Sequence, residues 1–325
     1  MALIFAVSAC DQPTDKQTVW DASLPWSAKE FHTKNAQDFA DAINTATHGT
    51  LRINIHPGAV LGLKGPSSLR ALGEGIVDMA EMAAFQQVGT EPILGIESLP
   101  FLVADQDELA ILYEILQPKL DEIFARRGIK LLYMVPWPNQ NLYFKREVHS
   151  ISELAGTKIR TYDRNSSNMV ARLGMSPVQL PSSDVTPALA SGMIDGAMTS
   201  TTTAAAQNFQ DFLSHIYRTN HLWISNFMGV NLGAYNALPA TIQNQLTQIA
   251  RDMQPGFWQV SSADDLAKLK ILEAGGITTI EPSAEMMAEM RALARPMWRE
   301  FADAVPGARE VLKTYLARTG KEPLE

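Results

Sequence analysis

The sequence of 325 residues contains a single cysteine, Cys10. One thiol excludes an intramolecular disulfide and every metal site that needs several thiolates. Long apolar runs are also missing, because no stretch beyond the first residues reaches the roughly 18 to 20 uninterrupted apolar residues that a membrane-spanning helix requires. The body of the chain is therefore expected to fold in water, without disulfides and without crossing a membrane.

Positive charge is in deficit. The chain has 27 Lys and Arg residues against 35 Asp and Glu residues, which gives a formal net charge of −8 and a pI near 5.3. Such a chain has no general electrostatic attraction for a phosphate backbone or for an anionic membrane surface. Nucleic acid is therefore not expected as a partner, and an anionic ligand would have to be held by a local site with few basic residues.

Short catalytic motifs are absent as well. The sequence contains no G-x-S-x-G, H-E-x-x-H, G-x-G-x-x-G or G-x-x-x-x-G-K-[ST]. Its six histidines are scattered without ligand spacing: His32, His48, His56, His149, His215 and His221. No metal and no cofactor are expected, and binding is favoured over catalysis. An enzyme of small organic acids stays an alternative, because catalytic groups can also come together from distant positions.

Apolar content of 46% in a chain of this length is enough for a large core and favours two domains. Leu51, Ile53 and Ile55 alternate with polar residues before Pro57, which is typical of a half-buried strand. Further strands and helices alternate along the chain, which predicts α/β units with largely parallel sheets. From Pro239 onward the pattern is helical, with expected interruptions at 254–256 and 275–276.

One segment occurs twice. Residues 71–80 read ALGEGIVDMA and residues 188–197 read ALASGMIDGA, with five identities at a constant offset of 117 (188 minus 71). Each copy predicts a helix that ends near a glycine in the left-handed conformation, Gly75 or Gly192, followed directly by a strand. Ligands bind at the carboxyl ends of strands in open α/β sheets, so two facing copies would enclose a cleft. The alternative is a chance recurrence of a common helix-strand pattern.

The N-terminus has two interpretations. Met1–Ala9 is a short apolar run, and Val7-Ser8-Ala9-Cys10 resembles the lipobox of bacterial lipoproteins, in which the cysteine is lipidated. A basic region before the apolar run is missing, so the run can equally be an incidental apolar tip or follow a start site placed too late. Residues 1–19 are assigned to a signal, lipid anchor and linker.

Residues 151–198 carry the most specific pattern. They contain TKIR (157–160), GMSPV (174–178) and ALASGMIDG (188–196), and this order resembles the solute-binding subunits of tripartite ATP-independent periplasmic (TRAP) transporters, the DctP family. The segments EFHTKNAQDFADAI, GEGIVDMAEM and ESLPFLV extend the likeness upstream. The resemblance implies a periplasmic protein with two α/β lobes, crossing strands and a long hinge helix, which delivers a ligand to a membrane permease.

The resemblance also implies lobe boundaries. Residues 20–137 plus 226–266 form the first lobe, and residues 138–225 plus 267–325 form the second, with the ligand cleft between them. A receptor subunit that senses a ligand without serving a permease is a further alternative.

Arg160 is the residue of the family motif that pairs with a ligand carboxylate, and a guanidinium offers the bidentate fork that fits this group. Some relatives carry a second arginine where this chain has Asn139 and Gln140. One arginine favours a monocarboxylate, such as a 2-oxo, hydroxy or aromatic acid, over a dicarboxylate. Asp163 stands where many relatives have asparagine, and could orient Arg160, contact a ligand hydroxyl or ammonium, or face solvent.

Other candidates lie in segments that should reach the cleft or end at it. Besides Arg160, Asp163, Asn139 and Gln140, the expected ligand-binding residues are Trp137, Phe31, His32, Glu81, Met198, Thr199 and Asn226. Trp26 lies in the same loop as Phe31 and His32. The aromatic members could equally be core residues.

Overall fold

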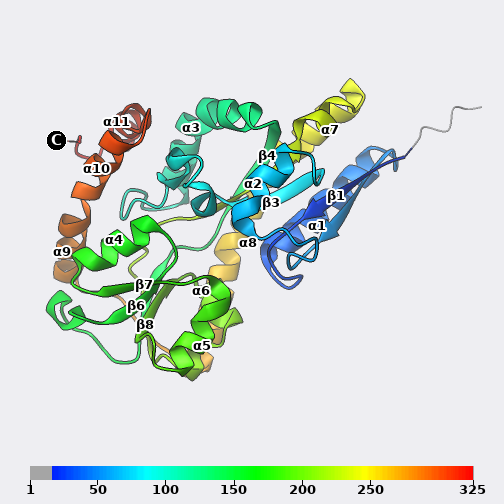
Figure 1. Cartoon of the computed structure of the whole chain (residues 1–325). Coiled ribbons are helices and arrows are strands. Elements are labelled where there is room, and N and C mark those ends of the chain that lie inside the picture. Colours follow the sequence, from blue (N-terminus) through cyan, green and yellow to red (C-terminus); the bar gives the residue numbers. More distant parts are fainter. Residues whose placement is uncertain (1–16, 325) are drawn as a thin grey trace, which may run out of the picture.

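The computed structural model describes residues 17–324, which form two lobes, each built on one β-sheet (Figure 1). Cys10 and residues 1–16 of the expected signal and linker segment lie outside the described residues, whereas Thr18 and Val19, also assigned to that segment, belong to the first strand. Among residues 17–324, no helix combines the length and the apolar character needed to cross a membrane. The two-lobed α/β architecture is confirmed, whereas the residue boundaries of the lobes stay a prediction.

The first lobe has a five-stranded sheet in the order β2-β1-β3-β10-β4. Its strands are β1 (Thr18–Ser23), β2 (Leu51–His56), β3 (Met79–Ala83), β4 (Ile129–Pro136) and β10 (Ser225–Asn231). The first three are parallel, but β10 runs antiparallel to both β3 and β4. Since β4 runs in the same direction as β1, β2 and β3, only β10, which enters from the other lobe, is reversed, and the expectation of largely parallel sheets is confirmed.

Helices cover both faces of this sheet. They are α1 (Phe31–Ala46), α2 (Gly65–Gly73), α3 (Gln106–Arg126) and the short α7 (Leu232–Asn236). The side chain of Asp105 caps α3 by accepting a hydrogen bond from the backbone N–H of Glu108 at 2.9 Å. The apolar face of α1, including Phe39 and Ile43, packs on one side of the sheet in the largest buried cluster.

The second lobe has a six-stranded mixed sheet in the order β11-β9-β5-β8-β6-β7. Its strands are β5 (Asn141–Phe144), β6 (Lys158–Thr161), β7 (Ser176–Gln179), β8 (Gly196–Thr199), β9 (His215–Tyr217) and β11 (Thr278–Ile280). Its helices are α4 (Arg164–Arg172), α5 (Val185–Ala190), α6 (Thr201–Ala206) and α9 (Ala284–Ala294). Strand β5 runs antiparallel to β8 and β9, because it too arrives from the opposite lobe.

Two segments cross between the lobes side by side. The chain leaves β4 through residues 137–140 to β5, and returns through residues 218–224 to β10. The backbone N–H of Trp137 donates to the carbonyl of Ile224 at 2.8 Å, and Gln140 exchanges backbone hydrogen bonds with Leu222 and His221. These crossing segments were expected, and the structure confirms them.

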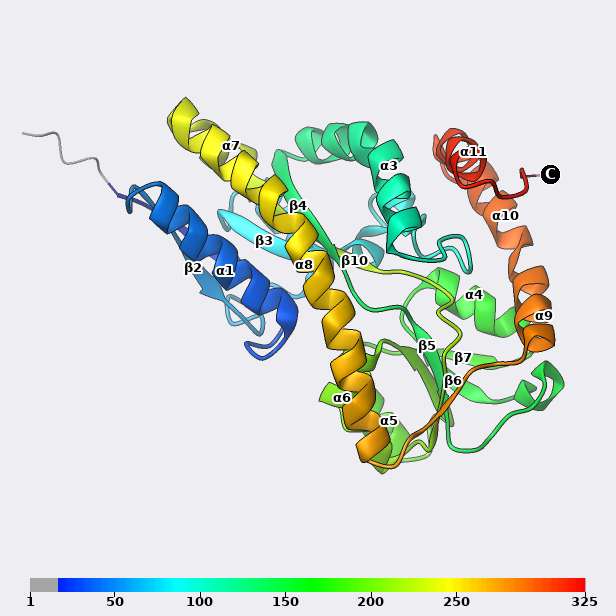
Figure 2. The ribbon, with the colours of Figure 1, turned by 180° about the vertical axis from the view of Figure 1, so that it is seen from behind.

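Helix α8 (Ala240–Ala274) spans both lobes along the back of the molecule (Figure 2). It packs on α1 and β4 in the first lobe and on α6 in the second. The expected interruption at 254–256 was wrong, because α8 continues through Pro255. Hydrogen bonds brace the helix there: Met134 N–H donates to Gln254 Oε1, and Trp258 Nε1 donates to the Met134 carbonyl, both at 2.9 Å.

The C-terminal helices connect the lobes a fourth time, after the two crossing segments and α8. Helix α9 packs on α4 of the second lobe, and α10 (Pro296–Ala304) and α11 (Ala308–Arg318) lead back to α3 of the first (Figure 2). The hydroxyl of Tyr315 donates to the Leu102 carbonyl at 3.1 Å, and Trp298 Nε1 donates to the Pro100 carbonyl at 2.8 Å. The segment predicted for the second lobe, residues 267–325, thus contacts both lobes.

The repeated segment has the same structure in both lobes. Gly75 and Gly192 have φ of 72° and 73°, and each follows the end of a helix and precedes a strand, β3 or β8. Each strand lies between one parallel and one antiparallel neighbour.

The repeated aspartate has a structural role. The carboxylate of Asp78 accepts from the N–H of Asp21 at 2.9 Å, and that of Asp195 from the N–H of Lys158 at 3.3 Å. Each therefore joins its copy of the repeat to the adjacent parallel strand, β1 or β6. The prediction of one architectural unit used twice is confirmed.

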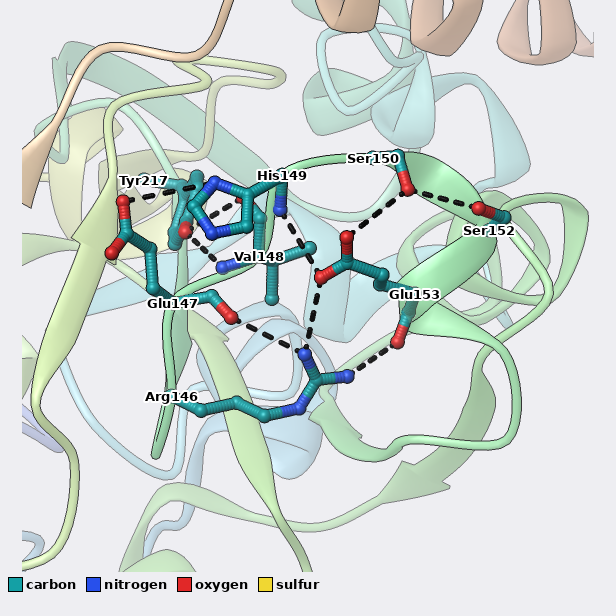
Figure 3. A network of polar contacts seen from close by, with 8 residues as sticks. All are labelled: Arg146, Glu147, Val148, His149, Ser150, Ser152, Glu153 and Tyr217. Atoms are coloured by element: carbon teal, nitrogen blue, oxygen red, sulfur yellow. Dashed lines mark hydrogen bonds and ion pairs between the residues drawn. The ribbon is translucent and has the colours of Figure 1, made fainter.

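A polar network holds residues 146–153, which follow β5 in the second lobe (Figure 3). Arg146 donates to the side chain and the carbonyl of Glu153, whose carboxylate also accepts from the His149 N–H. The Tyr217 hydroxyl both donates to and accepts from the backbone of Val148. The charged members are largely exposed, so this network orders a surface loop and contributes little net stability.

Candidate functional site

A cavity of about 880 Å³ lies where the two lobes and the crossing segments meet. The first lobe contributes Pro25, Trp26, Glu30, Pro66, Phe85, Gln86 and Val88; the crossing segments contribute Trp137, Gln140 and Ile224; the second lobe contributes Arg160, Tyr162, Asp163, Arg164, Gln179, Leu180, Pro181, Ser182, Thr199, Ser200 and Thr203. A smaller cavity of about 290 Å³ adjoins it and shares Val88, Asp163 and Arg164. The expected cleft between the lobes is present.

Arg160 is the buried cation of this cavity. Strand β6 places it at the carboxyl edge of the second sheet, where its side chain is 5% exposed. Nε donates to the Leu180 carbonyl at 3.1 Å and Nη1 to the Met198 carbonyl at 3.0 Å. Among residues 17–324 it forms no ion pair with a carboxylate, and Nη2 donates to no protein atom.

The charge of Arg160 persists despite burial. Desolvation lowers the pKa of its guanidinium to about 10, while Tyr162 and Asp163 act in the opposite direction. The group is therefore protonated at neutral pH. A desolvated cation that neutral carbonyls hold in place, with donors left over, is suited to an anionic ligand.

Tyr162 follows Arg160 by two residues and lines the same cavity. Its hydroxyl is buried and has no hydrogen-bond partner among the described residues. Its ring lies 5.1 Å (centroid to centroid) from that of Phe85, which belongs to the first lobe. Tyr162 thus adds a second unpaired donor near the arginine and also contacts the opposite lobe.

Asp163 caps the N-terminus of helix α4 and contacts the first lobe. Its carboxylate accepts from the Ser166 N–H at 2.7 Å and from Ser98 Oγ of the first lobe at 3.2 Å. Burial raises the pKa of this carboxyl, and the hydrogen bonds from Ser166 and Ser98 act in the opposite direction. With 5% exposure it does not face solvent, so that alternative is excluded. Asn165 adds hydrogen bonds to the Gly95 carbonyl and to Ser98 Oγ, each of 3.0 Å.

Aromatic rings form the wall opposite Arg160. The ring centroids of Trp26 and Trp137 lie 5.0 Å apart in an edge-to-face arrangement, and Phe31 and His32 pack behind Trp137 at 5.6 and 4.3 Å. Trp26 and Trp137 line the cavity, whereas Phe31 and His32 do not. Trp26 and Trp137 thus belong to the cleft wall, whereas Phe31 and His32 are core residues behind it.

Behind this wall lies a chain of buried polar groups. Trp137 Nε1 donates to Asn226 Oδ1 at 2.9 Å, and Asn226 Nδ2 donates to Glu81 Oε2 at 3.3 Å. His32 Nδ1 lies 3.4 Å from Glu81 Oε1, although without the geometry of a hydrogen bond. These residues fix the orientation of the Trp137 indole from behind.

The predicted ligand-binding residues therefore divide into two groups. Those that line the cavity are Trp137, Gln140, Arg160, Asp163 and Thr199. Those outside the lining are Phe31, His32, Glu81, Asn139, Met198 and Asn226, of which Met198 still contributes the carbonyl that holds Arg160. In the described part of the chain, no group of three or more His, Cys, Asp or Glu side chains could hold a metal ion.

Several lining residues were missed from the sequence. Tyr162 could have been found, because side chains two apart on a strand share a face and Arg160 was already assigned. Arg164, at the first position of α4, lines both cavities with an exposed side chain. Gln86 and Gln179 had no signal of their own, since nothing distinguishes a cleft glutamine from a surface one in a sequence.

Comparisons with known proteins agree with this architecture. The sequence model of bacterial extracellular solute-binding protein family 7, DctP, matches residues 23–304. A TRAP solute-binding protein from a marine metagenome, described as specific for pyroglutamate, has 27% identity and a TM-score of 0.85, covering 93% of this chain and 99% of its own.

Two further proteins are similar over most of their length. DctP7 of Bordetella pertussis, an extracytoplasmic solute receptor binding pyroglutamic acid, has 26% identity and a TM-score of 0.86, covering 92% of this chain and 99% of its own. A solute-binding protein of Albidiferax ferrireducens is 21% identical over 87% of this chain and 85% of that protein. The two-lobed chain with its buried arginine belongs to the DctP family of extracytoplasmic solute-binding proteins of TRAP transporters, which are transport receptors and not enzymes.

Proposed function

We propose that this receptor captures a small organic monocarboxylate with neutral polar groups, anchors its carboxylate on Arg160, and delivers it to the permease subunits of a TRAP transporter. The observation that carries the proposal is a buried, charged guanidinium that two backbone carbonyls hold at the cavity, without a carboxylate partner among residues 17–324. The similarity to receptors that bind pyroglutamate supports a compact acid of this kind.

The rest of the cavity favours one carboxylate over two. Asp163 and Glu30 belong to the lining, and a second carboxylate near them would meet like charge. The other polar lining groups are amides and hydroxyls, including Gln140, Gln179 and Thr199. Arg164 is a further cation, but its side chain is exposed at the first turn of α4 and so is screened by solvent.

The ligand is expected to bind as the lobes come together. The crossing segments 137–140 and 218–224, helix α8 and the C-terminal helices α9 to α11 connect the lobes, and the lobes can rotate about these connections. Closure removes water from Arg160 and strengthens its hydrogen bonds to the carboxylate. Such a charged hydrogen bond is worth about 1.5 to 3 kcal/mol, whereas micromolar affinity needs about 8 kcal/mol, so the walls must supply the remainder.

Calorimetry on Arg160 variants tests the anchor. A thermal-shift screen over pyroglutamate and 2-oxo, hydroxy, aromatic and sugar acids identifies the ligand. With that ligand, Arg160→Ala is expected to lower affinity at least tenfold, since it removes charged hydrogen bonds of about 1.5 to 3 kcal/mol. Arg160→Lys is expected to recover only part of the loss, because an ammonium lacks the planar fork. Unchanged affinity of Arg160→Ala would refute the assignment.

A further inference from the structure

The first lobe supplies few polar side chains to the cavity. Its lining residues are Pro25, Trp26, Glu30, Pro66, Phe85, Gln86 and Val88. The indole N–H of Trp26 is inaccessible, and the carboxylate of Glu30 already accepts from the backbone N–H of Ser27 at 2.6 Å. Among these lining residues, Gln86 is therefore the neutral side chain that can form a hydrogen bond from the first lobe to a ligand held on Arg160.

The two polar atoms of the Gln86 amide have different surroundings. Gln86 lies just after β3 and is half-buried. Its Oε1 is inaccessible and has no hydrogen-bond partner among the described residues, whereas Nε2, also without such a partner, is not enclosed in this way. Because Gln86 lines the cavity, Nε2 is the end of the amide that a ligand can reach. A carboxamide nitrogen donates and cannot accept, so it suits an acceptor oxygen.

Gly65 leaves the space in which this amide lies. A Cβ at Gly65 would lie 1.8 Å from Gln86 Oε1, 2.3 Å from its Cδ and 2.6 Å from its Nε2, closer than real Cβ atoms approach other heavy atoms. The oxygen thus lies over the Cα–H of the glycine, a weak donor that favours this orientation of the amide. Since the φ of Gly65 is not positive, this position requires the absence of a side chain and not a left-handed backbone.

A neighbouring contact fixes the backbone on both sides of this amide. Nε2 of Gln87 donates to the Gly65 carbonyl at 2.8 Å in a buried hydrogen bond. The segment that carries Gln86 is thereby tied to the start of α2. A methyl group added at Gly65 is therefore expected to displace the amide of Gln86 and to leave the backbone in place, because the end of a flexible side chain moves more easily than a tied backbone.

We propose that Gln86 is the specificity-determining residue of the first lobe, that its Nε2 donates a hydrogen bond to an acceptor oxygen of the ligand, and that Gly65 positions it. The inference rests on the proposed function, in which Arg160 holds the carboxylate in the second lobe. A contact with the first lobe that forms on closure favours the closed form, because a ligand shifts an equilibrium by its difference in affinity for the two states. The ligand therefore carries an acceptor oxygen besides its carboxylate.

Calorimetry on the full chain with two ring acids tests the donor. Pyroglutamate has a carbonyl oxygen besides its carboxylate, and cyclopentanecarboxylate has none. The variant Gln86→Met keeps the length of the side chain and removes the donor. It should weaken binding of pyroglutamate roughly three- to tenfold, the loss of one neutral hydrogen bond, and binding of cyclopentanecarboxylate less than about twofold. Equal losses for the two acids would show that Gln86 is only part of the wall and would overturn the proposal.

A double-mutant cycle tests the role of Gly65. Gly65→Ala should weaken binding of pyroglutamate about as much as Gln86→Ala does, without lowering the midpoint of thermal unfolding, and should cause no further loss when Gln86 is already alanine. Gly89→Ala is the matched control and should leave affinity unchanged, because its Cβ would meet no atom within 4 Å and its φ is not positive. Losses that add in the double variant would show that Gly65 acts independently of Gln86, which contradicts positioning.

The same measurements separate this inference from the proposed function. Unchanged affinity for both acids in Arg160→Ala would refute the carboxylate anchor, whatever the Gln86 variants show. Unchanged affinity for pyroglutamate in Gln86→Met, together with a loss in Arg160→Ala, would refute only the role of Gln86. A wild-type chain that binds neither acid would contradict both proposals.

Discussion

Arg160 and Glu97 are both buried ionisable side chains, but their partners differ. Arg160 is held by neutral carbonyls at the cavity, whereas Glu97 accepts from the N–H and hydroxyl of Ser225, each at 2.7 Å, and from the Tyr113 hydroxyl at 2.8 Å. Glu97 thereby ties the loop before α3 to the first residue of β10. The arginine keeps donors for a ligand, and the glutamate is used for structure.

Burial gives Glu97 a testable effect on stability. Desolvation raises the pKa of its carboxyl from 4.5 to about 7, although its hydrogen bonds act in the opposite direction. Between these values the folded chain holds a proton that the unfolded chain releases, so the contribution of Glu97 is greatest at low pH and is lost as pH rises through about 7. Each pH unit within this window corresponds to about 1.4 kcal/mol.

The variant Glu97→Gln should therefore gain stability relative to the wild type as pH rises from 5 to 7, and the difference should level off above that. Urea unfolding at pH 5, 6, 7 and 8 measures it. Glu122→Gln, at an exposed position of α3, is the control for replacing a carboxylate. Parallel curves for Glu97→Gln and the wild type would contradict the buried titration.

Two glycines near strand β8 have different structural roles: Gly192 lies in the turn before the strand, and Gly196 is its first residue. Gly192 has φ of 73° and a substituent there would meet no atom within 4 Å. A Cβ at Gly196 would lie 2.5 Å from the Tyr143 carbonyl oxygen and 3.0 Å from the Phe144 ring. The first glycine allows a left-handed turn, and the second allows β5 and β8 to approach.

These two positions predict different costs. Gly192→Ala should cost about 1 kcal/mol through backbone strain alone and leave ligand affinity unchanged. Gly196→Ala should cost up to about 3 kcal/mol, because β5 and β8 must separate. It should also weaken ligand binding, since β8 supplies the Met198 carbonyl that holds Arg160. Thermal unfolding and calorimetry check both, and equal effects of the two variants would contradict this distinction.

At the scale of the whole molecule, the lobes are joined by covalent connections and by a small polar contact. Ser98 and the Gly95 carbonyl of the first lobe bind Asp163 and Asn165 at the start of α4. This contact adjoins the cavity, because Asp163 belongs to its lining. The contact holds the residues that follow β6, the strand that carries Arg160, against the first lobe. Ligand binding at Arg160 and the separation of the lobes are therefore expected to affect each other.

Asn165→Ala is expected to favour separated lobes. The apparent affinity is proportional to the fraction of molecules in the binding-competent arrangement, so a several-fold loss of affinity is expected. X-ray scattering should also show a larger radius of gyration for the ligand-free variant. Asn168→Ala is the matched control, because Asn168 lies on the same helix without a hydrogen bond to another described residue. Unchanged affinity and radius for Asn165→Ala would show that the contact does not affect closure.

The sequence alone determined the features that depend on local chain geometry and on the family pattern. The repeated glycine and aspartate predicted one unit used twice, and the motif at 157–160 predicted an arginine at a strand end, because caps, turns and strand alternation are encoded within about ten residues. The proline within α8 was misjudged, because the contacts that hold the helix there come from β4, more than a hundred residues away in sequence.

Only the tertiary structure decided which candidates reach the cleft. His32 lies in the first turn of α1 and Glu81 in the middle of β3, and both side chains are buried behind Trp137 and do not line the cavity. Tyr162 lines the cavity because its ring packs on Phe85 of the other lobe, and its hydroxyl has no hydrogen-bond partner in the described part of the chain. The direction of a side chain relative to a cavity depends on packing between distant elements, and no local pattern in the sequence contains that information.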